Sequence, residues 1–250
     1  MTGAHLVVAA PATAIAVALA LGTTAPAPPR PALTASPGRV VLDGAARAEV
    51  RVAAPRGVEL VDVGLATYSL DLRGRPRLGG AARAPRWVSV RPSLLRVGAK
   101  GAAVTVAARP PRGAEPGDRP FALVLTTRAS GRHGVAVRLR IGVLVLARVP
   151  GRIVRRLVVG PLHVRQHGRA HVLELAIRNA GNVTERLPPG RIVLTLLRRG
   201  HVVARLRPPG RELLPHGRAL VSSLFRGGLR GPATVRVELG AFVHVYPVRL

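Results

Sequence analysis

Three histidines are the first candidates for chemistry, because His163, His167 and His171 recur at every fourth residue. On a helix this spacing would place three imidazoles on one face, as metal ligands. Gly168 and the strand-like alternation around it argue against a helix. We therefore expect surface histidines around a hairpin, with no metal site and no cofactor. His133 lies in a glycine-flanked turn and is interpreted as a loop residue.

Nucleophilic catalysis finds little support in the sequence. A serine nucleophile needs a base, an orienting acid and usually a strained turn such as G-x-S-x-G, which the chain lacks. Ser222 and Ser223 fall within a strand pattern, and Ser130 falls within a hairpin. The absence of cysteine excludes thiolate zinc sites, cysteine nucleophiles and disulfides.

Carboxylates suited to acid and base catalysis are also missing. Of the 11 acidic residues, Asp62 and Asp71 are expected to flank a strand. Asp118 fits a Pro-Gly-Asp turn in which its side chain would accept hydrogen bonds from local amides. We therefore predict that the protein is not an enzyme and that it has no catalytic, cofactor-binding or metal-binding residues.

Two short motifs have simple structural interpretations. The RGRPR segment at 73–77 matches the core of AT-hook peptides, which bind the minor groove of DNA. In a chain so rich in Arg, Gly and Pro this pentamer arises easily by chance, and a solvated loop between strands is expected. Asn182, Val183 and Thr184 form a glycosylation sequon, but Asn182 beside Gly181 is expected to form a turn.

The net charge of +28 is spread evenly along the chain. Residues 38–148 hold 20 Arg or Lys against 7 acids, and residues 149–250 hold 18 against 4. Neither half is a specialised basic arm, so the charge is interpreted as a solvated surface and no specific nucleic-acid partner is expected. A surface of this kind still attracts polyanions, and the attraction weakens with salt.

The positions of these residues depend on a strand pattern that is clearest at Val135–Val149. Apolar residues alternate there with Arg138 and Arg140, which gives a period of two. Pro150 and Gly151 then interrupt the pattern, because proline lacks a backbone donor and glycine frees φ. Strand-like sequence resumes afterwards, so one β domain is predicted to end here and another to begin.

Similar patterns recur throughout both halves, separated by Gly- and Pro-rich turns. In the first half the predicted strands are Arg39–Leu42, Ala48–Ala53, Val58–Ser69, Trp87–Val90, Ala102–Ala107, Phe121–Thr127 and Val135–Val149. In the second they are Ile153–Val159, His171–Arg178, Arg191–Leu197, His201–Leu206, Arg218–Leu224 and Ala233–Tyr246. This spacing is typical of antiparallel β-sandwiches. The cores should be aliphatic, with Trp87, Phe121 and Phe225 as rare bulky fillers.

The predicted fold class is all-β, with two tandem immunoglobulin-like antiparallel β-sandwiches after an N-terminal signal helix. Residues 1–27 are predicted to be a signal peptide, because an apolar block leads into small residues; an uncleaved membrane anchor and cleavage after Gly22 are the alternatives. Residues 28–37 are expected to form a Pro/Ala-rich linker, 38–149 the first sandwich and 150–250 the second. No second apolar run suggests a C-terminal membrane anchor.

Several of these segments together resemble a known family. They are Trp87–Ser93, the strand near Ala102–Ala107, Pro116–Asp118 before Phe121, RIGVLVLARVPG at 140–151, and the NAGNV turn at 179–183. In this order they resemble actinobacterial relatives of the WxL-interacting cell-surface proteins, over roughly residues 39–183. The resemblance implies a secreted, non-enzymatic envelope protein whose first domain binds peptidoglycan. The family's C-terminal transmembrane anchor and basic tail are missing here. A looser likeness links the chain to periplasmic pilus chaperones, which also have two immunoglobulin-like domains in tandem.

The sequence therefore predicts a secreted, cell-envelope-associated binding or assembly module. Its expected partner is a cell-wall polymer, either peptidoglycan or an anionic glycopolymer, or a surface protein. Two alternatives stay open: a pilus-type periplasmic chaperone and a basic nucleic-acid-binding protein. The ligand-binding residues are not identified, but two strands with exposed edges are candidates for partner contact, Val135–Val149 and the segment Phe242–Tyr246.

Overall fold

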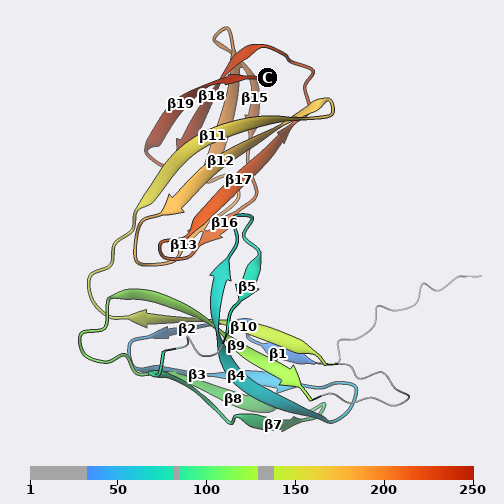
Figure 1. Cartoon of the computed structure of the whole chain (residues 1–250), viewed down its shortest axis with the longest axis vertical. Helices are drawn as coiled ribbons and strands as arrows, with labels where there is room; N and C mark the ends of the chain where they lie inside the picture. The colour runs from blue at the N-terminus through green and yellow to red at the C-terminus, as the bar shows by residue number, and fades with distance from the viewer. Residues whose placement is uncertain (1–32, 81–84, 129–137) are drawn as a thin grey trace, which may run out of the picture. The chain divides into compact units, whose positions relative to one another are not determined.

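The described part of the chain is built entirely from β-strands and their connections. The computed structural model describes residues 33–80, 85–128 and 138–250, which form 19 strands (Figure 1). The prediction of two tandem immunoglobulin-like antiparallel β-sandwiches is confirmed. The predicted signal peptide at 1–27 lies outside the described residues, as do Ser130 and His133.

The first sandwich consists of two facing sheets. One sheet has the order β1 (Thr34–Ser36), β3 (Ala46–Ala53), β8 (Ala102–Ala108) and β6 (Val88–Arg91). The other has the order β2 (Arg39–Asp43), β10 (Arg140–Val149), β9 (Gly117–Thr127), β4 (Glu59–Leu70) and β5 (Pro76–Leu78), and β7 (Leu94–Val97) pairs with β4. The strands are antiparallel neighbours, except that β2 runs parallel to β10.

Buried and exposed side chains alternate along these strands, and the buried ones form the core. Val50 and Val52 of β3 are fully buried, whereas Arg51 between them is exposed, as the period of two requires. Trp87 packs edge-on against Phe121, with ring centroids 6.1 Å apart. The core is otherwise aliphatic, as the composition predicts.

The second sandwich is built in the same way. One sheet has the order β11 (Leu157–His167), β12 (Ala170–Asn179) and β17 (Arg218–Phe225). The other has the order β15 (His201–Leu206), β14 (Ile192–Arg198), β18 (Pro232–Leu239) and β19 (Phe242–Arg249), and β13 (Glu185–Leu187) pairs with β16 (Arg211–Leu213). Leu173, Leu175 and Phe225 belong to its core.

Three sequence-based assignments are wrong in detail. Ala233–Tyr246 is not one strand, because Gly240 adopts a φ of 60° and turns the chain from β18 into β19. The strand predicted at Ile153–Val159 begins later and runs to His167, because Val154 and Arg156 accept backbone hydrogen bonds from the β12–β13 turn instead. The predicted linker at 28–37 contains β1 and the buried Leu33, so the fold begins before residue 38.

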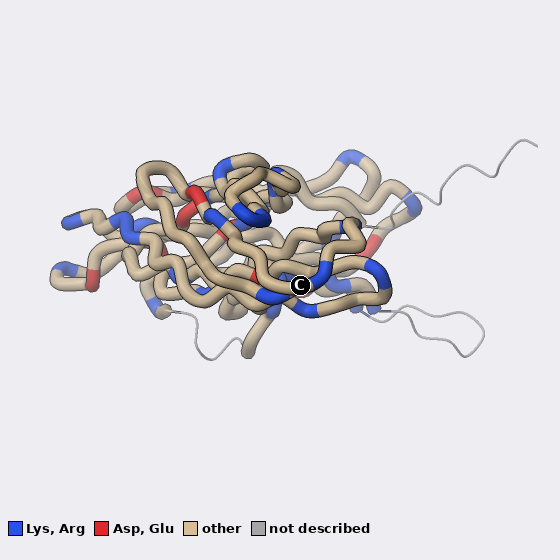
Figure 2. Tube along the Cα trace, turned by 90° about the horizontal axis from the view of Figure 1, so that it is seen from above, with Lys and Arg blue, Asp and Glu red and all other residues tan. Residues whose placement is uncertain are grey.

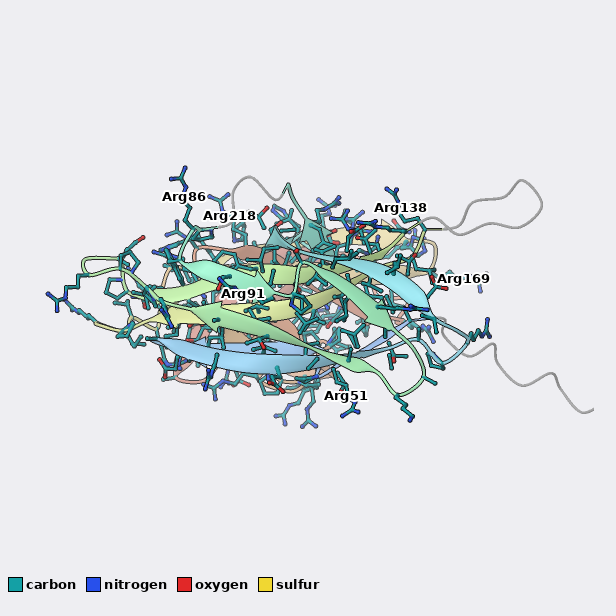
Figure 3. The ribbon with its side chains drawn as sticks, turned by 90° about the horizontal axis from the view of Figure 1, so that it is seen from below. Arg51, Arg86, Arg91, Arg138, Arg169 and Arg218 are labelled. Atoms are coloured by element: carbon teal, nitrogen blue, oxygen red, sulfur yellow. The ribbon has the colours of Figure 1, made fainter. Side chains whose placement is uncertain are left out.

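Charge is distributed over both sandwiches. Lys and Arg residues recur along the whole described trace in Figure 2, and acidic residues are interspersed among them. Arg51 and Arg138 in Figure 3 point away from the ribbon. Within residues 33–80, 85–128 and 138–250, no helix has the length and apolar character needed to cross a bilayer.

Candidate functional site

One edge of β10 is only half covered by a neighbouring strand. Along one side, β9 pairs with β10 over its whole length, but on the other side β2 pairs only from Leu144 to Arg148. The Leu144 N–H donates to the Gly38 carbonyl at 3.1 Å, which shows that its backbone groups point toward β2. Because successive residues of a strand point their backbone groups to opposite sides, those of Arg140 and Gly142 also face that edge.

The backbone N–H and C=O groups of Arg140 and Gly142 therefore have no partner strand within the described residues. An edge of this kind is a template for pairing with another extended chain. The sequence predicted partner contact on Val135–Val149. Within that segment the structure places the free edge at the start of β10, and residues 135–137 lie outside the described residues.

Small residues create a hollow outer face beside this edge. The register aligns residues of β10, β9 and β4 in two rows, Gly142–Val124–Gly64 and Leu144–Ala122–Ala66. Four of these six residues are Gly or Ala, so the face is hollow between larger neighbours, and Tyr68 packs against the buried Ala66, Ala122 and Val124 at its side. The opposite face of the same strands carries the packed core of the first sandwich.

The short strand β5 borders the hollow. It pairs with the end of β4, and Leu78 in β5 lines two adjoining cavities on the outer face. One cavity, of about 380 Å³, is lined by Gly38, Tyr68, Pro76, Leu78, Ala122, Gly142 and Leu144. The other, of about 500 Å³, extends along β4 toward Asp62 and Arg140. We call the two cavities together the outer-face groove.

The groove has one polar end and one apolar end. At the polar end Arg140, Thr126 and Asp62 form the next row of the register, and Asp62 is paired with Arg128 at 3.0 Å. At the apolar end, Tyr68 is half-buried, and its burial, together with the nearby Glu212 carboxylate, raises the pKa of the phenol despite the opposing effect of Arg39. Tyr68 therefore stays protonated at neutral pH and can donate a hydrogen bond.

A buried ion pair holds the other end of β10. The Asp118 carboxylate in β9 is 1% exposed and accepts hydrogen bonds from Arg148 Nε at 2.8 Å and from the Thr184 N–H of the second sandwich at 2.7 Å. Burial would raise the pKa of Asp118, but these hydrogen bonds and the Arg148 charge outweigh it and lower the pKa. The sequence predicted a turn residue serving local amides. That prediction is wrong, because both partners are distant in sequence.

The turn at Asn179–Val183 joins the same contact. The Asp118 N–H donates to the Asn182 carbonyl at 2.8 Å, and Asn182 Nδ2 donates to the Pro116 carbonyl at 3.0 Å. Gly117 has a φ of 120°, and a Cβ there would lie 2.2 Å from the Asn182 carbonyl oxygen. Only glycine fits at this position. The Pro-Gly-Asp and Asn-Ala-Gly-Asn motifs singled out in the sequence thus meet and fasten the two sandwiches together.

The other sequence candidates do not converge on a site. His163 and His167 lie in β11 and His171 lies in β12, and the described residues contain no group of three potential metal ligands. Ser222 and Ser223 lie in β17, as predicted.

The remaining carboxylates and motifs have structural positions. Asp71 follows β4 as expected, whereas Asp62 lies within it. The RGRPR segment at 73–77 lies only partly in a loop: residues 73–75 belong to the β4–β5 loop, where Asp71 Oδ1 accepts hydrogen bonds from the Arg73 and Arg75 amides at 2.9 Å, and Pro76 and Arg77 begin β5.

The second predicted contact strand, near Phe242–Tyr246, is the edge strand β19. The reciprocal backbone bonds between Leu250 and Gly231 show that even-numbered residues of β19 face β18. The free edge therefore carries the backbone groups of Val243 and Val245, whose side chains are about half exposed. Pro247, next on this edge, has no N–H to offer.

Comparisons with known proteins support the fold. Neither a comparison with protein families nor one with curated proteins finds a match. Among solved structures, the chain resembles the class 5 fimbriae chaperone CfaA, with a TM-score of 0.50, 11% identity, and coverage of 87% of this chain and 98% of that one. This likeness shows the shared two-sandwich fold.

Two further solved structures are similar at lower scores. One is the Salmonella enterica SafA pilin in complex with the SafB chaperone, with a TM-score of 0.45, 12% identity, and coverage of 90% and 99%. The other is the CsuC-CsuE chaperone-tip adhesion subunit complex of Acinetobacter baumannii, with a TM-score of 0.46, 12% identity, and coverage of 86% and 97%. The resemblance to WxL-interacting proteins finds no support here, whereas the looser likeness to pilus chaperones agrees with the fold.

Proposed function

We propose that the protein is an exported, pilus-chaperone-like binding protein that holds an extended segment of a surface protein on the free edge of β10. The observation that carries the proposal is that the backbone groups of Arg140 and Gly142, which pair with no strand among the described residues on that edge, lie beside the outer-face groove. Similar chaperones are described with pilin or tip-subunit partners. The function needs no catalysis, in line with the sequence prediction.

Binding would proceed by strand addition. An incoming strand would accept hydrogen bonds from the free N–H groups of β10 and donate hydrogen bonds to its free C=O groups. Each bond would contribute about 0.5–1.5 kcal/mol net. Alternate side chains of that strand would enter the groove and contact Leu78, Leu144 and Ala122. The first cavity is mainly apolar, which favours a peptide side chain over a cell-wall polysaccharide as its occupant.

The domain organisation follows from the same proposal. We take 38–149 as the binding sandwich, extended at its start by Leu33 and β1, and 150–250 as the second sandwich. The Asp118 contact joins them. Residues 1–27 would direct export, which brings the protein to its partner in the cell envelope.

Site-specific photocrosslinking in the producing cell tests the function. A photoreactive residue at Arg140, on the rim of the groove, should form an adduct with an exported protein, and mass spectrometry should map the adduct to a segment of alternating apolar residues. Gly142→Leu in the same chain should abolish that adduct by filling the groove.

The matched control places the photoreactive residue at Val243, on the edge of β19. It should not crosslink to the same segment. The proposal is overturned if both positions give the same adducts, or if the adduct at Arg140 survives Gly142→Leu in a folded protein.

A further inference from the structure

Three loops at one end of the second sandwich carry arginines and no acidic residue. They are the β11–β12 turn at 166–171, the β14–β15 turn at 198–201 and the β17–β18 loop at 226–231. Together they contain Arg169, Arg198, Arg199, Arg226 and Arg230. The last two loops are in direct contact, because Arg198 Nη2 donates to the Arg230 carbonyl at 3.4 Å. This end of the sandwich is therefore a concentrated positive region.

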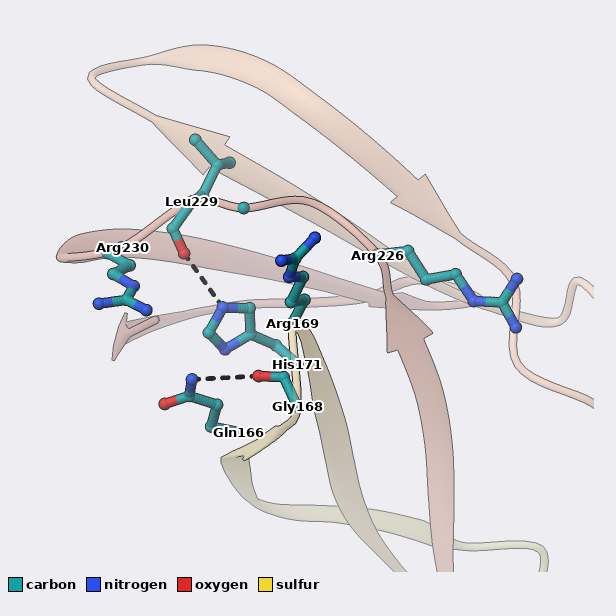
Figure 4. A pocket seen from close by; sticks show the side chains of 8 residues that line it. Gln166, Gly168, Arg169, His171, Arg226, Leu229 and Arg230 are labelled. Carbon is teal, nitrogen blue, oxygen red and sulfur yellow. Dashed lines mark hydrogen bonds between the residues drawn. The ribbon is translucent and has the colours of Figure 1, made fainter.

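Two of these loops enclose a pocket of about 370 Å³. It is lined by Gln166, Gly168, Arg169, His171, Arg226, Gly228, Leu229 and Arg230. Figure 4 shows Arg169 from one loop and Arg230 from the other on either side of the His171 ring, whereas the side chain of Arg226, also from the second loop, extends away from it. A pocket of this volume can hold a small ligand.

His171 fixes the shape of the pocket. Its side chain is 5% exposed, and Nε2 lies 3.0 Å from the Leu229 carbonyl, which ties the β17–β18 loop to β12. The imidazole stacks on Phe225, with ring centroids 6.4 Å apart. Gly227 lets the loop pass close to that ring, because a Cβ there would lie 2.1 Å from Phe225 Cζ. The loop is thus held in place by buried groups before any ligand arrives.

The pocket arginines differ from other arginines of the same sheet in lacking a counter-charge. Arg165, four residues before Arg169, pairs with Glu174 at 2.8 Å. Arg169, Arg226 and Arg230 form no ion pair with any described residue. Like charges beside one recess repel each other, and an anion that accepts hydrogen bonds from Arg169 and Arg230 would relieve that repulsion.

We propose that this pocket binds a phosphate group, either on a free phosphorylated molecule or on the headgroup of an anionic lipid. Guanidinium groups match the tetrahedral oxygens of phosphate through bidentate hydrogen bonds. A phosphate with up to two negative charges offsets more of this positive charge than a single carboxylate would. The pocket lies in the second sandwich, so this inference is independent of partner binding at β10.

Calorimetric titration of the full chain with pyrophosphate, at about 150 mM NaCl, tests the site. The wild type should bind, and the variant Arg169→Gln, Arg226→Gln, Arg230→Gln should bind at least about 10-fold more weakly, because it removes the charge-assisted hydrogen bonds to the phosphate oxygens. Arg169→Lys should lose less than Arg169→Gln, since it keeps the charge but not the planar fork.

The matched control removes three exposed arginines elsewhere. The variant Arg47→Gln, Arg96→Gln, Arg112→Gln loses the same net charge from the first sandwich. It should bind pyrophosphate within about 2-fold of the wild type. The proposal is overturned if the wild type does not bind, or if both triple variants weaken equally, which would indicate a general effect of net charge.

A second arm separates the two sources of phosphate. Sedimentation with vesicles of phosphatidylglycerol should recover the wild type but not the pocket variant if the ligand is a lipid headgroup. If the ligand is a free molecule, the two proteins should sediment equally while pyrophosphate binding still depends on the pocket. The proposed phosphate site is contradicted if the pocket variant binds both vesicles and pyrophosphate as well as the wild type does.

Discussion

The edges of β10 and β19 differ in what lies beside them, although both were expected to contact a partner. At β19 the residues with free backbone groups, Val243 and Val245, have side chains that are 51% and 52% exposed. Their register neighbours in β18 are Glu238 and Arg236, two long side chains that pair with each other. This edge is exposed and apolar, but its neighbouring face is occupied.

At β10 the neighbouring face is hollow. Gly142 lies opposite Val124, and the next row ends in Ala66, so a side chain arriving at this edge finds space rather than an ion pair. Among the described residues, β2 begins at Arg39, opposite Leu144, and leaves the first part of the β10 edge open. Solvent exposure alone therefore does not identify a strand-binding site, whereas a free edge beside small residues does.

Filling the hollow should have the largest effect on binding. Gly142→Leu places a branched side chain next to Leu78, because even its Cβ would lie 3.6 Å from Leu78 Cδ1, so the incoming side chain loses its space. We expect partner affinity to fall about 100-fold, or about 2.8 kcal/mol. Fluorescence anisotropy with a labelled peptide of the crosslinked segment measures it. Val243→Leu on β19 is the control and should bind within about 2-fold, so equal losses would remove the distinction between the edges.

Breaking the ion pair at the far end of β10 should have the next largest effect, on stability. Arg148→Met leaves Asp118 buried with only the Thr184 amide as a partner, and should cost about 2 kcal/mol of unfolding free energy in urea titrations, since Arg148 is 31% exposed. Arg165→Met removes an ion pair whose arginine is 63% exposed.

The second variant should cost under about 0.5–1 kcal/mol, as exposed pairs do. Equal costs for Arg148→Met and Arg165→Met would show that the buried carboxylate does not stabilise the start of the second sandwich against β10.

Removing one free backbone amide of β10 should weaken partner binding less than filling the groove does. Arg140→Pro deletes an N–H that faces the open edge, so it breaks no ladder bond of the free protein but removes a donor to the partner. We expect about 10-fold weaker binding of the labelled peptide and nearly unchanged thermal stability. Val245→Pro does the same to the β19 edge and should leave binding unchanged. A large fall in the melting temperature of Arg140→Pro would mean that this amide is already bonded.

Acid should weaken the fold through Asp118. Because the pKa of Asp118 is lowered in the folded state, its stabilisation is present above its ordinary pKa near 4 and is lost as the pH falls through the folded value. Unfolding free energies measured from pH 6 downward should therefore decline below about pH 4. The unfolding free energy of Asp118→Asn should decline less steeply with falling pH. Identical slopes for the two proteins would show that Asp118 does not cause the loss of stability in acid.

The sequence was informative wherever alternation was long. The strand pattern around Val50 and Leu173 predicted strands that bury one face, and both lie in the sandwich cores. Strands of three or four residues, such as β5, β7, β13 and β16, carry too few alternations to stand out. Gly240, inside the predicted strand Ala233–Tyr246, is the turn signal that separates β18 from β19.

The outer-face groove could not be predicted from the sequence, for a different reason. Gly64, Ala66 and Ala122 occupy outer-face positions, but their alignment depends on the pairing of β4, β9 and β10. Leu78 comes from a three-residue strand, and its position follows from pairing with Tyr68. A run of small residues at alternate positions in two predicted neighbouring strands is the signal that could have indicated a hollow face.

Site-resolved amide hydrogen exchange by NMR, with and without the crosslinked peptide, tests the central claim most directly. In the free protein the amides of Arg140 and Gly142 should exchange fast, because no strand of the described residues covers them, and the peptide should protect both while leaving Val243 and Val245 unchanged. If Arg140 and Gly142 stay unprotected in the complex, or if protection falls on β19 instead, β10 is not the edge that binds the partner.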